Sequence, residues 1–413
     1  MIARFLPLFI LLILLPDFYL YRQLVARRTQ SVPLRVAWWI PTVVLTIYTI
    51  ILFFSTNFIP ENPRLLNFYL LVLGVFTLPK VLLAISLWVG EWIGKKRHWR
   101  HHYALPVGMA LGLIPAWSTV YGSFFGFQEL EVNRVDCYFD DLPKGFDGYC
   151  IALFSDAHVG SYTGGDSLVL ERAVDSLLAM KADAIFFLGD LQNIGPWEIK
   201  EKATLLSRLT APDGVYSILG NHDYSAYQGG GFRRKLAQEK QTEQAERELG
   251  WRLLLNENTV LRHNGDSIML CGMEGNEKKG ADHGIGLIHK ALEGVGDNQF
   301  AILLAHNPKI WRKYALPLST AQLTLSGHTH GGQMGIFGVT TTSPFYSENG
   351  GLYEEGNRKL FVTKGVGALI PMRFNVPGEV VLLTLHRQTN PPRQSTLAIS
   401  PNNPQSRHPI TRS

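Results

Sequence analysis

The sequence predicts a membrane anchor built from helices over residues 1–126, followed by an α/β body with mixed sheets over 127–386. Four apolar runs at the start come close to the length that a helix needs to cross a bilayer. After them, short apolar runs alternate with amphipathic stretches, which is typical of strands alternating with helices. The polar, proline-rich stretch 387–413 predicts a disordered tail.

The predicted spans cover 5–21, 37–55, 66–93 and 104–126. Buried core helices are the alternative, but the lengths of the last three runs and their aromatic ends favour a bilayer. The first run has a short apolar part followed by Pro16 and Asp17, so it is either a signal-like segment or a bent span. We count it as a span because no cleavage site of small residues follows it.

The charges of the loops predict the orientation of the anchor. Residues 1–126 carry eleven basic and three acidic side chains, and the basic ones gather in loops 22–36 and 94–103. Basic loops stay in the cytoplasm, so the body is expected outside the cytoplasmic (inner) membrane, on the periplasmic side in a Gram-negative cell. The segment 127–386 holds 24 basic against 31 acidic residues, which argues against nucleic-acid binding.

Lys80 follows Pro79 near the middle of the third span. It could contact a lipid or a proton inside the bundle, or it could snorkel or stay neutral at a proline kink. The spans otherwise lack the paired ionisable groups that a transporter needs, so the sequence predicts a plain anchor.

In the body, apolar runs at 151–155, 184–188, 215–219, 268–272, 301–305 and 323–326 predict buried strands. Helices are expected at 167–180, at 197–209 behind Pro196, and at 232–249. The last of these is charged and rich in Gln, which predicts a solvent-exposed helix.

Polar clusters follow most of these strands. They are Asp156-Ala157-His158, Gly189-Asp190, Gly220-Asn221-His222-Asp223, His306-Asn307 and Gly327-His328-Thr329-His330. Open α/β sheets place their sites beyond the carboxyl ends of the strands, so these clusters are expected to meet in one crevice. Carboxylates with neutral imidazoles suit Mn, Fe or Zn, and their number exceeds what one ion needs, which indicates a two-metal site.

The ordered motifs D-x-H, G-D, G-N-H-D, a lone His and G-H-x-H resemble the calcineurin-like metallophosphoesterase superfamily. The stretches 142–148, 331–333 and 371–375 are similar to its branch of membrane-associated bacterial phosphodiesterases. The resemblance covers about 127–386 and implies a four-layer α/β/β/α sandwich. It further implies that Asp156, His158 and His330 hold one metal, that Asn221, His306 and His328 hold the other, and that Asp190 bridges both.

The same resemblance implies that a hydroxide bridging the metals attacks phosphorus while His222 protonates the leaving group and Asp223 orients His222. Asn193 stands where many relatives have an acidic residue. This difference leaves all the implied metal ligands in place and changes only a residue that contacts a ligand. Arg373 is expected either at a phosphate or head group or in a surface salt bridge.

The remaining His and Cys residues have no partner motifs. His263, His283 and His289 are expected to be solvated, and Cys137, Cys150 and Cys271 to be buried thiols. Cys137 and Cys150 flank a turn, so a disulfide between them in an oxidising compartment is the alternative.

Together these features predict a membrane-anchored, metal-dependent phosphoric ester hydrolase with two divalent ions. Its expected substrate is a phosphodiester or pyrophosphate, linked to a lipid or envelope component. The alternatives are an enzyme like the UDP-diacylglucosamine pyrophosphatases, which would need a cytoplasmic site, and a catalytically silent metal-binding scaffold. The expected partners are the substrate and membrane lipids; metal identity and oligomeric state stay open.

Overall fold

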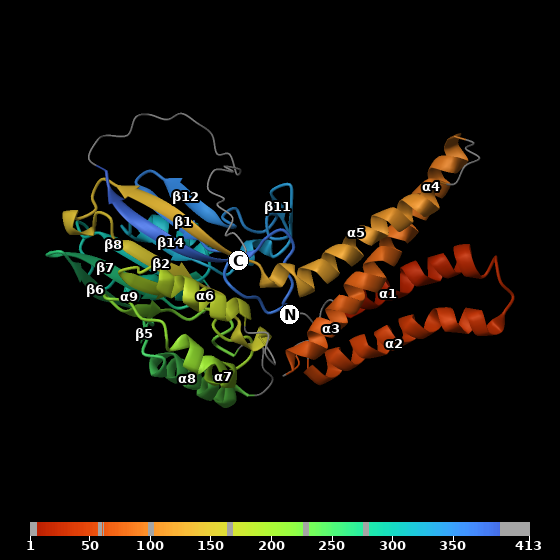
Figure 1. Ribbon diagram of the computed structural model, residues 1–413, viewed down its shortest axis with the longest axis horizontal. Helices are drawn as coiled ribbons and strands as arrows, with labels where there is room; N and C mark the ends of the chain where they lie inside the picture. Colours follow the sequence, from red (N-terminus) through yellow and green to blue (C-terminus); the bar gives the residue numbers. More distant parts are fainter. Residues whose placement is uncertain are drawn as a thin grey trace.

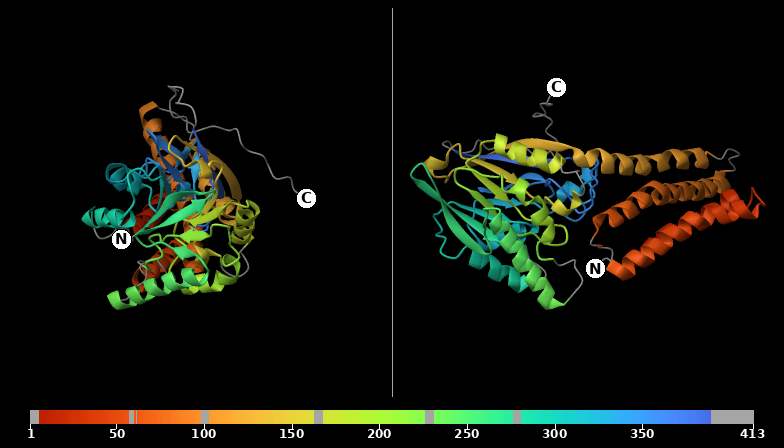
Figure 2. Two further views of the ribbon diagram at one scale, coloured as in Figure 1. Left: turned by 90° about the vertical axis from the view of Figure 1, so that its left-hand side faces the viewer. Right: turned by 60° about the horizontal axis from the view of Figure 1, so that its bottom comes forward.

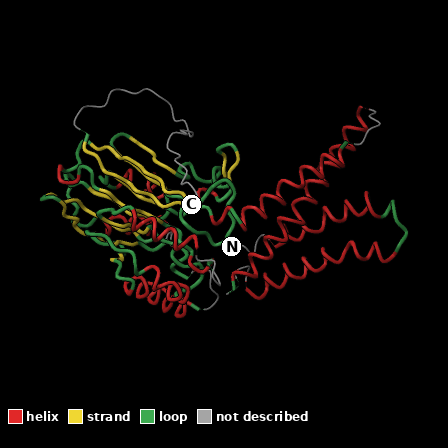
Figure 3. The backbone as a smooth tube through the Cα atoms, in the orientation of Figure 1, coloured by secondary structure: helices red, strands yellow, loops and turns green. Residues whose placement is uncertain are grey.

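The computed structural model describes residues 6–56, 60, 62–97, 103–162, 168–225, 231–275 and 281–388. Long helices form a bundle, and an α/β body begins where the last of them ends (Figure 1). The described residues of the bundle form helices joined by short links, and the strands gather in the body (Figure 3). The predicted tail lies outside the described residues except for its first two positions, and the domain boundary at 126 stays a prediction.

Four apolar helices in the described residues are long enough to cross a bilayer, as predicted. They contain α1 (Leu6–Leu20), α2 (Val32–Thr56), α3 (Pro63–Val72) with α4 (Leu78–Arg97), and α5 (Ala104–Phe124). A π-helical turn over Leu73–Thr77 joins α3 to α4. The span of α1 continues to Val25 in spite of Pro16, so the first apolar run is a full-length helix.

The basic link between α1 and α2 and the body lie at opposite ends of the bundle. Figure 1 shows this link, and the end of α4 that carries Lys95 and Lys96, on the side away from the body. The right-hand view of Figure 2 shows the same separation. This arrangement is the one that the orientation prediction requires, and the side of the membrane stays a prediction.

An ion pair connects the spans, in which the Asp17 side chain is buried and the Lys80 side chain is 27% exposed. Lys80 Nζ lies 2.8 Å from Asp17 Oδ1 and 3.0 Å from Oδ2, and the Asp17 side chain is 3% exposed. The hydroxyl of Thr42 on α2 donates a hydrogen bond to the same carboxylate. The expectation that the spans lack paired ionisable groups is therefore wrong. Snorkelling does not describe Lys80, because its Nζ meets a carboxylate of α1.

The body contains two six-stranded mixed sheets. The first has the order β1 (Leu130–Phe139), β14 (Gly378–Arg387), β2 (Cys150–Phe154), β3 (Ala184–Phe187), β4 (Val215–Ser217), β5 (Arg252–Leu253). The second has the order β12 (Gly351–Glu355), β13 (Arg358–Val362), β9 (Leu323–Ser326), β8 (Ala301–Ala305), β7 (Asp266–Met273), β6 (Glu257–His263). All six strands expected from apolar runs are present within a few residues of their predicted bounds.

The layers follow the predicted α/β/β/α order. One apolar core, with Leu153, Phe186 and Leu304, lies between the sheets. Behind the first sheet, α6 (Leu168–Ala179), α7 (Trp197–Leu206) and α8 (Phe232–Glu248) enclose a second core, and α9 (Ala281–Ala291) packs on the second sheet with a third. A single short turn of helix, α10 (Leu316–Leu318), precedes β9.

The helix α8 is less exposed than its composition predicts. Thr242 and Glu246 on one of its faces are fully buried. The Thr242 hydroxyl donates a 3.0 Å hydrogen bond to Gln192 Oε1, in the loop that follows β3. Polar residues of α8 thus hold the loop that follows β3. The number of charged residues in the helix does not indicate this contact.

Candidate metal centre

The polar clusters meet where the carboxyl ends of parallel strands face one another. The strands β2, β3 and β4 run parallel in the first sheet, and β8 and β9 run parallel in the second. Each is followed directly by one of the clusters, so the loops of both sheets contribute to one site. The predicted convergence at strand ends is thereby confirmed.

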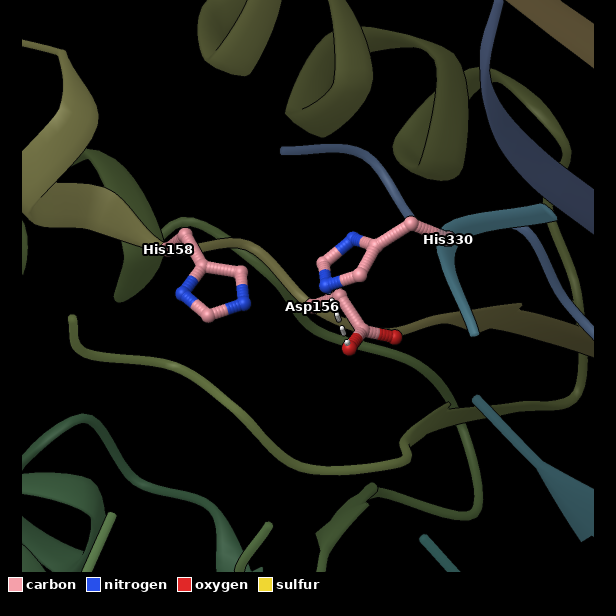
Figure 4. A group of neighbouring side chains, drawn as sticks. All are labelled: Asp156, His158 and His330. Atoms are coloured by element: carbon pink, nitrogen blue, oxygen red, sulfur yellow. Dashed lines mark ion pairs between the residues drawn. The ribbon is translucent and has the colours of Figure 1, made fainter. Parts of the chain in front are cut away.

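Three overlapping groups of side chains have ligand atoms within 4.8 Å of one another: Asp156 with His158 and His330, Asp190 with His306 and His328, and His158 with Asp190 and His222. Figure 4 shows the first group, in which His330 Nε2 lies 3.6 Å from Asp156 Oδ1. The first group contains the residues of the first ligand set that the resemblance implies, and the second joins Asp190 to the two histidines of the other set. Asn221 lies between Gly220 and His222, both of which contact Asp190.

Asp190 is the centre of the arrangement. Its Oδ2 lies 3.2 Å from His306 Nε2 and 3.7 Å from His158 Nε2, so one carboxylate faces a histidine of each ligand set. Its Oδ1 accepts a 2.7 Å hydrogen bond from the N–H of His222. This position between both sets is the one that a bridging ligand needs.

The backbone at these residues is strained. Asp156, His158, Asp190, His328 and His330 all have φ between 45° and 73°, in the left-handed region that L-residues rarely adopt. Such conformations persist only where the surroundings hold them, and they gather at functional sites. Five such residues in one cluster indicate a functional site whose surroundings hold the side chains in fixed positions.

Glycines allow the loops to approach the carboxylates. A Cβ at Gly220 would lie 2.2 Å from Asp190 Oδ1, and one at Gly327 would lie 2.5 Å from Asp156 Oδ2. Both distances are shorter than any van der Waals contact. The glycines of the G-N-H-D and G-H-x-H motifs therefore serve close packing around the two carboxylates.

Hydrogen bonds fix the direction of the imidazoles. His306 Nδ1 is 2.7 Å from the carbonyl of Leu188 and His330 Nδ1 is 3.2 Å from that of Gly367, so each Nδ1 carries a proton and each Nε2 faces a carboxylate. His328 is reversed: its Nε2 lies 2.9 Å from the Tyr346 hydroxyl and its Nδ1 3.2 Å from His306 Nε2. Tyr346 has no motif around it, so the sequence alone does not single it out.

The electrostatics of the site fit cations. Burial lowers the pKa of His158 well below its usual value and that of His328 to about 3, so both rings are neutral, as ligands must be. Burial would also lower the pKa of His306, but the Asp190 carboxylate raises it to about 10. Within the described residues, Asp156 Oδ1 and His158 Nε2 form no hydrogen bond although they are buried. Divalent ions would satisfy these atoms and neutralise both carboxylates.

Asn193 lies directly behind His158. Its side-chain oxygen is 3.1 Å from His158 Nδ1, and its amide is 2.8 Å from Ser161 Oγ. An amide rotated by half a turn would instead donate to His158 Nδ1 and to the His158 carbonyl and accept from the hydroxyl and the N–H of Ser161, which is the orientation that these neighbours favour. Only the first orientation places the imidazole proton on Nδ1 and leaves a lone pair on Nε2, so metal binding requires that orientation.

Replacing Asn193 by alanine should therefore weaken metal binding about 10–100-fold, because the partner that fixes the His158 tautomer is lost. Asn193→Asp supplies an acceptor at the same place and should retain the affinity. Isothermal titration with Mn²⁺ measures both. Equal affinities of Asn193→Ala and the wild type would show that Asn193 does not orient His158.

Asp223 does not orient His222, contrary to the prediction. Its carboxylate accepts hydrogen bonds from the backbone N–H groups of Asp190, Leu191, Gln192 and Gly220 at 2.8–3.2 Å. The ring of His222 is held instead by the Asn193 carbonyl, 2.8 Å from Nδ1. Asp223 thus connects the loops after β3 and β4, and burial together with the Asp190 charge raises its pKa to about 7.

Both expectations for Arg373 are wrong. The residue is fully buried, and its guanidinium donates to six backbone carbonyls, those of His330, Lys364, Gly365, Gly367, Val376 and Pro377. A guanidinium whose donors are used in this way does not face a phosphate or form a surface salt bridge. It holds together the loops that place His330.

The other singled-out residues lie apart from these groups. His263 is half-buried against the ring of Tyr149 instead of solvated, His289 is exposed, and the His283 side chain lies outside the described residues. The three cysteines are free thiols, so the alternative of a disulfide is not seen. Cys137 and Cys271 are buried as expected, and Cys150 is half-buried.

Comparison with known proteins finds similarity to metallophosphoesterases. Residues 3–127 match the family described as "Probable Calcineurin-like phosphoesterase, transmembrane domain", and residues 150–332 match "Calcineurin-like phosphoesterase". The uncharacterized metallophosphoesterase YkuE of Bacillus subtilis is 30% identical over 259 residues, which cover 60% of this chain and 82% of YkuE. A transmembrane protein with metallophosphoesterase domain from Danio rerio is 28% identical over 408 residues, 91% of this chain and 87% of that protein. The solved structure of a dimetal phosphatase from Danio rerio, 13% identical, covers 53% of this chain and 88% of that one with a TM-score of 0.29.

Proposed function

Because this chain belongs to the calcineurin-like metallophosphoesterases, we propose that it hydrolyses a phosphodiester or pyrophosphate bond in a lipid or envelope component, outside the cytoplasmic membrane. The chain is an integral membrane, metal-dependent phosphoester hydrolase. The observation that carries the proposal is the pair of ligand groups on either side of Asp190.

In this proposal Asp156, His158 and His330 hold one cation, Asn221, His306 and His328 hold the other, and Asp190 serves both. Two divalent ions would supply the positive charge that stabilises the phosphoryl oxygens and acidifies a water molecule. The residues of the chain orient this chemistry. Backbone carbonyls hold His306 and His330, and Tyr346 holds His328, so the ligand atoms are placed before the substrate arrives.

His222 is the proposed proton donor to the leaving oxygen. Its ring lies against that of His158, with 4.7 Å between centroids, at the edge of the ligand groups. A carbonyl can only accept, so the Asn193 carbonyl keeps a proton on Nδ1. The proton that moves is therefore the one on Nε2.

The junction between bundle and body supports a substrate at the membrane surface. The backbone N–H of Arg373 donates a 3.0 Å hydrogen bond to the carbonyl of Gly122 in α5. A Cβ at Gly126 would lie 2.0 Å from the Arg373 carbonyl, so the chain after α5 packs directly on the loop that also surrounds His330. The centre is thereby fixed close to the end of a span.

Activity of the purified, Mn²⁺-loaded full-length protein tests the reaction. Bis(p-nitrophenyl) phosphate, p-nitrophenyl phosphate and a lipid pyrophosphate should be compared, and turnover of the first or the third is the expected result. A protein that turns over none of them with Mn²⁺ or Zn²⁺ would be the catalytically silent scaffold instead.

Protease treatment tests the side of the membrane. In spheroplasts of a Gram-negative host the body should be digested by added protease, while in inverted membrane vesicles it should be protected. The reverse pattern would contradict the proposal, and would favour an enzyme like the UDP-diacylglucosamine pyrophosphatases, whose substrate lies in the cytoplasm.

A further inference from the structure

A cavity of about 600 Å³ lies between the bundle and the body. On the bundle side, Phe68 and Leu71 of α3 and Phe124 of α5 line it. On the body side, Val169 of α6 and Met372 line it. Its walls are mostly apolar on both sides, which suits a hydrocarbon chain more than a soluble metabolite.

The cavity borders the lipid-exposed helices, and one end of it lies near the metal centre. Its walls α3 and α5 belong to predicted spans, so a lipid can reach it from the surrounding leaflet. At the body end Ser161 lines it, and the Ser161 hydroxyl lies 2.6 Å from the carbonyl of Ala368 and 2.8 Å from the Asn193 amide. Asn193 in turn contacts His158, so only two side chains separate this end of the cavity from a proposed metal ligand.

Polar groups stand at the rim of the cavity. Arg64 in the first turn of α3 lies at the end of the bundle that faces the body, where the phosphates of a leaflet would lie. A guanidinium suits such phosphates. Asn67 Oδ1 is buried and accepts no hydrogen bond from the described part of the chain, so it can accept one from a hydroxyl of a head group.

From this combination we propose that the cavity binds one acyl chain of a membrane lipid whose phosphoester is held at the metal centre. The proposal rests on the proposed function and adds the class of substrate: a phospholipid that enters sideways from the bilayer. The apolar walls take the chain, Arg64 and Asn67 take polar parts of the head group, and Ser161 marks the end nearest the metal ligands.

Photo-crosslinking of the full-length protein in nanodiscs tests this proposal. The probe is phosphatidylglycerol with a diazirine at the end of one acyl chain, and crosslinked peptides are identified by mass spectrometry. We expect crosslinks to the body peptides that contain Val169 or Met372, and a several-fold loss in Leu71→Trp, whose indole fills the cavity. Leu111→Trp, on the exposed face of α5, is the matched control and should change nothing.

Adding Mn²⁺ separates a substrate from a structural lipid. If the phosphoester is held at the metal centre, the yield of crosslinks should increase when metal is added. Equal yields with and without Mn²⁺ would overturn the proposal. The absence of crosslinks from the body peptides would overturn it as well. Failure of the proposed function gives a different result, since it removes turnover of bis(p-nitrophenyl) phosphate without affecting the crosslinks.

A second inference rests on a separate feature, the hairpin of β10 (Gly335–Ile336) and β11 (Val339–Thr340). Phe337 at its tip is 96% exposed, and Ile336, Val339 and the nearby Phe345 are exposed as well. Phe337 and Gly338 have φ of 52° and 80°, as in a hairpin turn that favours Asn, Asp or Gly. A phenylalanine at such a strained position, with its ring exposed, indicates a contact outside the body.

The hairpin lies beside the end of α5 (Figure 1). Ile336 and Phe337 line a cavity of about 540 Å³ together with Ile114, Trp117 and Tyr121 of that helix. Trp117 and Tyr121 also contact Phe374, whose carbonyl accepts a 3.0 Å hydrogen bond from the N–H of Gly335. Trp and Tyr at the end of a span mark the interface of the bilayer, and Ile114 lies one turn deeper.

The geometry points to insertion of this hairpin tip into the lipid leaflet around the bundle. A nitroxide attached to Phe337→Cys in nanodiscs, with Cys150 replaced by serine, reports its surroundings. The nitroxide at position 337 should be more accessible to oxygen than to a water-soluble nickel chelate. The control Val260→Cys, an exposed position in β6 far from the bundle, should show the reverse order. The same order at both positions would overturn the inference.

Discussion

Replacement of Asp190 by asparagine should abolish the hydrolysis of bis(p-nitrophenyl) phosphate by the full-length protein. The Asp190 carboxylate lies between the two ligand groups, 3.2 Å from His306 Nε2 and 3.7 Å from His158 Nε2. Asparagine has almost the same shape but no charge, so each proposed cation loses its shared anion. Removing one preorganised electrostatic contact from an active site costs about 10²–10³ in turnover. The loss of a carboxylate that two ions share should lower turnover by at least that factor.

The substitution is chosen so that the fold survives. An asparagine oxygen can still accept the 2.7 Å hydrogen bond from the N–H of His222. Without the Asp190 charge, burial lowers the pKa of His306, so its ring can lose its proton and no unpaired cation stays buried. The thermal midpoint should therefore stay close to that of the wild type, while the metal content measured by mass spectrometry falls by at least one ion per chain. Asp175→Asn, an exposed carboxylate paired with Arg208, is the matched control and should keep both metal and activity.

Turnover retained by Asp190→Asn at wild-type metal content would contradict the bridging role. Loss of turnover with both ions retained would instead place the effect on a step after metal binding, for which His222 is the nearest group. Metal content thus has to be measured on the same preparations as activity.

The features that the sequence predicts correctly are local ones. The spans and the six strands follow from apolar runs whose residues are neighbours in the chain, and the structure places them within a few residues of the expected bounds. The gathering of these side chains could be predicted because each motif directly follows a strand, and their role as metal ligands stays a prediction. Parallel strands bring such loops together whatever the rest of the chain does.

The features that it misses depend on contacts between distant parts of the chain. Asp17 looked like an interruption of an apolar run, and only the packing of α1 against α4 makes it the partner of Lys80. Arg373 has the charge of a phosphate-binding residue, but the loops around it offer six carbonyls. The resemblance predicts that Asp223 orients its neighbour His222, whereas its carboxylate faces the backbone of the preceding loop. In each case the type of residue shows that the side chain is charged, but it does not show which group the side chain contacts.

The ion pair in the bundle should have the largest effect on stability. Lys80→Met removes the ammonium group and leaves the Asp17 carboxylate, 3% exposed, with the Thr42 hydroxyl as its remaining described partner. Breaking one side of a buried pair costs about 3–5 kcal/mol, because the other charge stays buried without compensation. The thermal midpoint of the full-length protein in detergent should fall, whereas Lys96→Met, at the exposed end of α4, should leave it unchanged.

The double variant Asp17→Asn/Lys80→Met decides what the pair contributes. If the loss in Lys80→Met comes from the unpaired carboxylate, removing that charge should restore most of the midpoint, because neutral residues of similar volume often replace a buried pair without cost. Neither residue belongs to the metal centre, so the double variant should also hydrolyse bis(p-nitrophenyl) phosphate at close to the wild-type rate. A restored midpoint with lost turnover would mean that the charges themselves act on the centre through the bundle. The pair would then have a role beyond joining α1 to α4.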